Sequence, residues 1–73
     1  MIKVFTTPSC VYCHALLDWF DDLGLDYSEM NALDFPEVQS VPLTIFVDEN
    51  GTETSVQGFD RPKIKKLLKS GNF

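Results

Sequence analysis

The 73-residue sequence has only two cysteines and one histidine, and it lacks any long apolar run. A membrane-spanning helix needs about 20 consecutive apolar residues, so we expect no transmembrane segment and no membrane partner. The start of the chain also lacks the charged, apolar and small-residue zones of a secretory signal. We therefore expect an intracellular, cytoplasmic protein. In that reducing compartment a close cysteine pair is more typical of catalysis or metal binding than of a structural disulfide.

Basic residues are scarce over most of the chain. Only Lys3 lies before position 61, whereas all eleven acidic residues lie within residues 1–60. The net charge of −5 argues against nucleic-acid binding. We interpret the basic stretch 61–73 as containing a last helix whose lysines complement its own C-terminal dipole. A docking surface for an acidic partner is the alternative.

Local patterns predict one small domain, residues 1–73, in which strands and helices alternate. We expect strands at 2–6, 25–29, 43–47 and 52–57, helices at about 11–23 and after Asp60, and one helical turn at 35–38 capped by Asp34. The first strand is apolar on both faces, which places it inside the sheet. The first β-α-β unit requires a parallel pair, and the Asn50-Gly51 hairpin adds an antiparallel one. The predicted fold class is α/β, with a four-stranded mixed sheet, two main helices on one face and a shortened middle helix.

Both cysteines lie in Cys10-Val11-Tyr12-Cys13, where the first strand turns into the first helix. The free N–H groups and the dipole of a helix N-terminus favour a thiolate. We expect Cys10 to be the nucleophile, with its pKa lowered from about 8.5 toward about 7. The more buried Cys13 would then resolve the mixed disulfide. Val11 and Tyr12 are expected to form an exposed rim.

Three landmarks occur in order along essentially the whole chain: Cys10–Cys13, then Ser40–Pro42 before an apolar strand, then Gly58–Asp60 before the last helix. Together they resemble the glutaredoxin group of thioredoxin-fold proteins. The resemblance implies a minimal thioredoxin/glutaredoxin-like fold and a redox-active thiol–disulfide oxidoreductase that acts in electron transport and cell redox homeostasis. It also implies a cis peptide bond before Pro42, beside the dithiol, and a substrate backbone paired with Val41. Gly58, Phe59 and Asp60 would add substrate contacts, and in that family the equivalent acid holds the glutathione amino group.

Within that group, Val11 and the run 58–62 look more like the NrdH-redoxin branch. Those proteins take electrons from thioredoxin reductase and pass them to ribonucleotide reductase, which implies the same partners for this chain. Tyr12 and Asp60 are instead similar to glutathione-dependent glutaredoxins, so a small glutaredoxin with glutathione as co-substrate is the alternative. Thr7, where glutaredoxins often carry Lys, and a single glycine before the last helix argue against glutathione. We expect a monomer with no tightly bound cofactor.

Other uses of the same cysteines stay open. Cys10-Val11-Tyr12-Cys13-His14 matches the pattern that attaches c-type haem, with Met30 as an axial ligand, although the strand-rich plan differs from helical cytochromes. Structural zinc needs four ligands, which two cysteines and one histidine do not supply, so we expect no metal site. An iron–sulfur cluster bridging a dimer through Cys10 and a non-catalytic interaction domain are further alternatives. His14 is expected on the helix surface behind the dithiol, where it could tune Cys13.

Overall fold

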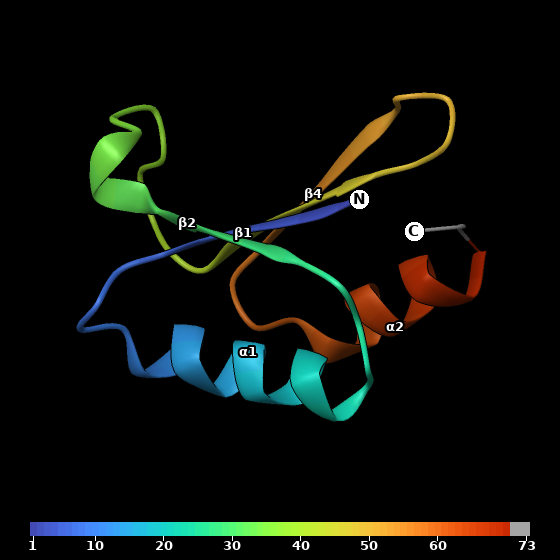
Figure 1. The fold of residues 1–73 in the computed structure, drawn as a ribbon, viewed down its shortest axis with the longest axis horizontal. Coiled ribbons are helices and arrows are strands. Elements are labelled where there is room, and N and C mark those ends of the chain that lie inside the picture. Colours follow the sequence, from blue (N-terminus) through green and yellow to red (C-terminus); the bar gives the residue numbers. More distant parts are fainter. Residues whose placement is uncertain (71–73) are drawn as a thin grey trace.

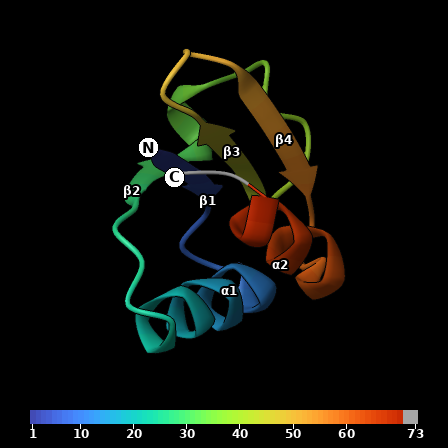
Figure 2. The ribbon, with the colours of Figure 1, turned by 90° about the vertical axis from the view of Figure 1, so that its right-hand side faces the viewer.

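The computed structural model describes residues 1–70. Its elements are β1 (Ile2–Thr6), α1 (Val11–Asp22), β2 (Ser28–Asn31), a 3-10 turn η1 (Ala32–Asp34), β3 (Leu43–Val47), β4 (Glu53–Gln57) and α2 (Arg61–Ser70). Within these residues the four strands form one sheet in the order β2-β1-β3-β4, with β1 parallel to β2 and the other two pairs antiparallel. Both helices lie on the same side of the sheet (Figures 1 and 2). The α/β prediction, with the first strand inside the sheet, is confirmed. In the part of the chain that is described, no helix is long and apolar enough to cross a membrane.

The hydrophobic core lies between the sheet and the two helices. Strand side chains alternate between the two faces, so every second residue of β1, β3 and β4 points toward the helices. The buried cluster comprises Ile2, Val4, Leu16, Leu17, Trp19, Phe20, Phe46, Val56 and Ile64. Phe20 and Phe46 are wholly buried and are the largest of the fully buried side chains. The core therefore fixes α1, and with it the cysteine pair at its start, against the central strands.

Helix α1 ends one residue before the predicted Leu23, and the strand after it begins later than expected. Gly24 has φ +70°, and its N–H donates to the Asp21 carbonyl while the Leu25 N–H donates to the Phe20 carbonyl. These two hydrogen bonds, together with a glycine in the left-handed conformation, form a common C-terminal end of a helix. Leu25 and Tyr27 then pack against the core. The predicted strand at 25–29 is therefore wrong at its start, because β2 begins only at Ser28.

The short middle helix also differs from the prediction. The helical turn lies at Ala32–Asp34 and not at 35–38, and its N-cap is Asn31. The Asn31 side-chain oxygen accepts a hydrogen bond from the Leu33 N–H at 3.0 Å. Phe35 instead packs edge-on against Phe5, with ring centroids 5.1 Å apart. The capping oxygen thus comes from the end of β2, three residues before the Asp34 that the sequence suggested.

Asp48 closes the predicted hairpin between β3 and β4. Its Oδ1 accepts hydrogen bonds from the N–H groups of Asn50 and Thr52, both at 2.9 Å, and Gly51 has φ +83°. Because these bonds are exposed, Asp48→Ala should lower the free energy of unfolding by roughly 1 kcal/mol, as measured by urea denaturation. Asp48→Asn keeps an acceptor oxygen and should stay close to the wild type. Equal losses in both variants would contradict a hydrogen-bonding role.

Tyr27 ties the segment between α1 and β2 back to α1, because its hydroxyl donates to Asp21 Oδ1 at 2.9 Å. Burial, followed by the hydrogen bond to Asp21 and its charge, raises the pKa of Tyr27 from 10.0 to about 12. This pKa is higher in the folded state than in the unfolded state. The contribution of Tyr27 to the free energy of unfolding is therefore complete below pH 10 and is lost as the pH rises toward 12. A spectrophotometric titration compared with Tyr27→Phe should show this late phenolate step. A Tyr27 step near pH 10 would contradict it.

Candidate functional site

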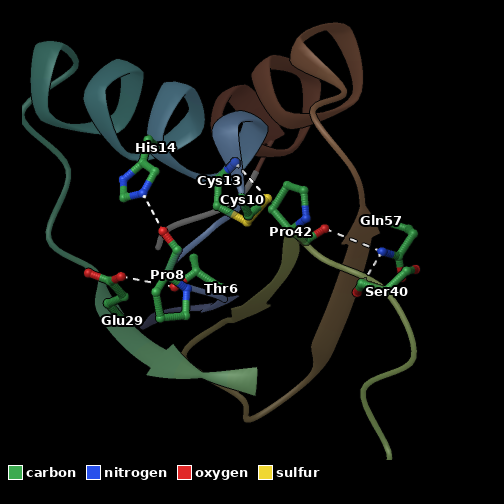
Figure 3. Close-up of a disulfide and its surroundings, with 9 residues drawn as sticks. All are labelled: Thr6, Pro8, Cys10, Cys13, His14, Glu29, Ser40, Pro42 and Gln57. Carbon is green, nitrogen blue, oxygen red and sulfur yellow. Dashed lines mark hydrogen bonds between the residues drawn. A yellow bond between two sulfur atoms is a disulfide. The ribbon is translucent and has the colours of Figure 1, made fainter. Parts of the chain in front are cut away.

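Cys10 and Cys13 are joined as a disulfide where the loop after β1 enters α1 (Figure 3). Their Cα atoms lie 5.2 Å apart. Cys10 is the N-cap of α1, and its sulfur accepts a hydrogen bond from the Cys13 N–H at 3.1 Å. The sulfur therefore lies at the positive end of the helix dipole and faces an otherwise unpaired helix N–H group. This placement favours a thiolate at Cys10 once the disulfide is reduced.

The two sulfur-bearing residues differ sharply in exposure. Cys13 is 1% exposed, whereas Cys10 is only partly buried. Val11 and Tyr12, which lie between them in the sequence, are 77% and 71% exposed, as predicted. Cys10 is therefore the more solvent-accessible of the two cysteines, while Cys13 lies in the interior.

The turn before β3 lies beside the disulfide, with Pro42 next to Cys10 (Figure 3). The Val41–Pro42 peptide bond is cis, the geometry that the resemblance implied. The Gly58 N–H donates to the Pro42 carbonyl at 2.8 Å. The Gln57 amide donates to the carbonyls of Ser40 and Pro42 at 3.0 and 3.3 Å. These bonds fasten the proline turn to the start of the last loop, so two landmarks far apart in sequence meet at the cysteine pair.

The remaining predicted site residues lie at the start of α2. Asp60 is exposed, and its Oδ1 accepts a hydrogen bond from the Lys63 N–H at 3.3 Å, which confirms the predicted helix cap. Phe59 is half-buried and stacks on Trp19 with ring centroids 5.8 Å apart. The Arg61 guanidinium carbon lies 5.1 Å from the centroids of both rings. Phe59 therefore joins α2 to α1, and a substrate contact by Phe59 or Asp60 stays a prediction.

An open surface pocket of about 380 Å³ is lined by residues on the opposite side of the cysteine loop from Pro42 (Figure 3). It is lined by Thr6, Thr7, Pro8, His14, Glu29 and Asn31. His14 is exposed, and its Nε2 lies 3.3 Å from the Pro8 carbonyl oxygen. The Thr6 hydroxyl donates to Glu29 Oε2 at 2.9 Å. Sequence reasoning did not identify the Thr6–Glu29 pair, because their contact depends on the register of β1 against β2.

Among residues 1–70, no cluster of three or more His, Cys, Asp or Glu side chains could hold a metal ion. Met30, considered above as a haem ligand, lies on β2, opposite Phe5 in the register. The Cys10–Cys13 disulfide and the proline turn beside it form the candidate site, whose chemistry is that of a dithiol–disulfide pair (Figure 3).

Comparisons with known proteins agree with this geometry. Residues 2–50 match the family model described as Glutaredoxin. No curated protein sequence matches the chain. The NrdH-redoxin from Escherichia coli, a glutaredoxin-like protein, is 27% identical with a TM-score of 0.72, covering 90% of this chain and 92% of that one. The glutaredoxin from Archaeoglobus fulgidus is 16% identical with a TM-score of 0.72, covering 93% and 85%. The thioredoxin-like protein BC3987 is 23% identical with a TM-score of 0.72, covering 93% and 100%.

Proposed function

Because the chain belongs to the glutaredoxin family and is a thiol–disulfide oxidoreductase, we propose that it is a dithiol electron carrier that reduces protein disulfides. Cys10 is the nucleophile and Cys13 the resolving thiol. The observation that carries this division of roles is the geometry of the helix start. The sulfur of Cys10 receives the Cys13 N–H and lies near solvent, while Cys13 is 1% exposed.

In the proposed reaction, the Cys10 thiolate attacks one sulfur of a substrate disulfide. The substrate S–S bond breaks, a mixed disulfide forms, and the second substrate sulfur leaves as a thiolate that takes up a proton. Cys13 then loses its proton and attacks the Cys10 sulfur, which forms the Cys10–Cys13 disulfide and releases the other substrate thiol. Two electrons and two protons reach the substrate. The Cα separation of 5.2 Å lies within the range that a disulfide spans.

The proline turn supplies a place for the substrate chain. We propose that a substrate backbone adds as an extended strand along Val41, where main-chain hydrogen bonds give affinity without requiring a particular sequence. Its support is the placement of Pro42 beside the disulfide and the Gly58 bond that fixes the turn. Such binding would bring a substrate disulfide to the exposed side of Cys10.

Thioredoxin reductase is the proposed electron source, and ribonucleotide reductase the proposed acceptor. Val11 and the run 58–62 resemble NrdH-redoxins, and the 27%-identical neighbour is an NrdH-redoxin described as having a thioredoxin-like activity profile. A cytoplasmic monomer with no tightly bound cofactor is part of the same proposal. Glutathione is the second candidate donor, and the observation that favours it is the exposed Asp60 carboxylate at the start of α2.

A coupled NADPH assay distinguishes the two donors. One arm contains thioredoxin reductase alone, and the other contains glutathione with glutathione reductase, each with the same small disulfide substrate. We expect turnover in the first arm. Turnover only in the second arm would overturn the proposed donor and leave the dithiol chemistry intact. Silence in both arms, with both thiols shown to be reduced, would overturn the proposed function.

The variant Asp60→Asn tests the role of the carboxylate without removing the helix cap, because Asn is also a good N-cap residue. In the thioredoxin reductase arm, kcat/KM should stay within about twofold of the wild type. If glutathione is bound there, loss of a charge-assisted hydrogen bond should lower kcat/KM for glutathione by about tenfold. Equal losses in both arms would contradict a donor-specific role for Asp60.

A further inference from the structure

Among the described residues, one buried side-chain polar atom has no hydrogen-bond partner, and it is the hydroxyl oxygen of Thr44. The Thr44 side chain is 0% exposed. Buried hydroxyls are nearly always hydrogen-bonded, because an unpaired one keeps the full cost of leaving water. Thr6, the other buried polar residue, shows the usual behaviour, since its hydroxyl donates to Glu29. The hydroxyl of Thr44 therefore needs a physical explanation.

Thr44 lies in the centre of the sheet, on the face that the helices cover. In the register it is directly opposite Val4 on β1 and Val56 on β4, and both of these residues belong to the core between sheet and helices. It follows Pro42 by two residues, which is about 7 Å along a strand. Pro42 lies beside the disulfide (Figure 3). Thr44 is thus the next residue of β3 after Pro42 on the same face of the sheet, and it lies deeper in the core than Pro42, which flanks the cysteine pair.

Cys13 is buried on the helix side of the core and is joined to Cys10, which lies next to Pro42 (Figure 3). It is 1% exposed and begins the buried stripe of α1, which continues with Leu16, Leu17 and Phe20. In the disulfide the Cys13 sulfur carries no proton. On reduction it becomes a buried thiol, which is both a donor and an acceptor, and its thiolate is a stronger acceptor. Reduction therefore creates a second buried group that needs a hydrogen-bond partner, in addition to the Thr44 hydroxyl.

We propose that Thr44 is a positioning residue for Cys13, and that its hydroxyl hydrogen-bonds the Cys13 sulfur in the dithiol state. The hydroxyl accepts from the Cys13 thiol and donates to the thiolate that attacks Cys10. The inference rests on the proposed dithiol function. Because the hydroxyl has no partner while the disulfide is present, a bond gained when two electrons and two protons convert the disulfide into two thiols stabilises the reduced form relative to the oxidised form. The Thr44 hydroxyl thus sets how readily the pair gives up its electrons.

The test measures the equilibrium of the Cys10–Cys13 pair with reduced and oxidised dithiothreitol. In that exchange the protein disulfide becomes a dithiol while the reagent dithiol becomes its own cyclic disulfide. Thr44→Val keeps the shape and removes the hydroxyl. It should lower the equilibrium constant for reduction of the protein by about fivefold, which makes the potential more negative by about 20 mV, given about 30 mV per tenfold change. Thr44→Ser keeps the hydroxyl and should hold the wild-type potential.

A merely structural role would change stability in both redox states and leave the potential where it is. An unchanged potential in Thr44→Val would therefore overturn the inference, and so would equal shifts in the Val and Ser variants. If Thr44→Val does not fold, Thr44→Ser and Thr44→Ala differ by the hydroxyl alone and give the same comparison. Failure of the wild-type pair to equilibrate with dithiothreitol would instead overturn the proposed function together with the inference.

Discussion

The Cys10→Ser protein should lose disulfide exchange, with turnover reduced by about three orders of magnitude or more. Its hydroxyl is not ionised near neutral pH, so the helix start has no thiolate to stabilise. Cys13→Ser keeps the nucleophile and removes the group that releases the substrate. It should accumulate a mixed disulfide between Cys10 and the substrate. Mass spectrometry of the protein, without added reductant, should show this as an increase in mass equal to the attached substrate thiol. The geometry behind both outcomes is the Cys13 N–H pointing at the Cys10 sulfur.

The two serine variants control for each other, because each removes one sulfur from the same helical turn. Circular dichroism should show the same helix content in both. A mixed disulfide trapped through Cys13 in the Cys10→Ser protein would reverse the assigned roles. Such a result would mean that Cys13, which is 1% exposed in the disulfide form, becomes accessible on reduction.

Phe20→Ala should lower the free energy of unfolding by about 3–5 kcal/mol, because it removes a buried aromatic ring and leaves a cavity. Phe20 is 0% exposed, and its ring lies 5.8 Å from those of Trp19 and Tyr27. Small domains have total stabilities of about 5–15 kcal/mol, so this change would leave a protein close to unfolding. Urea denaturation of the oxidised form measures the difference.

Leu33→Ala is the matched control for Phe20→Ala. Leu33 is an apolar side chain that is 73% exposed, and its truncation should change the free energy of unfolding by less than about 0.5 kcal/mol. Similar losses in the two variants would contradict the placement of the core between α1 and the sheet.

Much of the fold could be predicted because its signals are local. The β-branched first strand, the helix that Gly24 ends and the Asn50-Gly51 hairpin each depend on residues close in sequence. The start of β2 could not be predicted, because Leu25 and Tyr27 alternate as a strand would but pack against the core. The middle turn was misplaced because two capping residues, Asn31 and Asp34, compete, and the end of β2 decides between them.

In the candidate site, too, some features could be predicted from the sequence and others could not. The cysteine pair and the Asp60 cap are visible in sequence, since spacing and position alone define them. The cis bond before Pro42 came only from the resemblance. The buried position of the Thr44 hydroxyl follows from the strand register. The stacking of Arg61 on Trp19 and Phe59 follows from the way the two helices pack against each other. No local pattern carries such information.

The most direct test of the central claim is the mass of the reduced protein after stoichiometric reaction with a disulfide-containing peptide. We predict that each protein molecule loses two hydrogens, that the peptide gains two, and that peptide mapping finds Cys10 linked to Cys13 within one chain. This is the pairing that the structure contains. Thiols that stay reduced, or a disulfide between two protein molecules, would contradict the claim that Cys10 and Cys13 act as an electron-carrying dithiol.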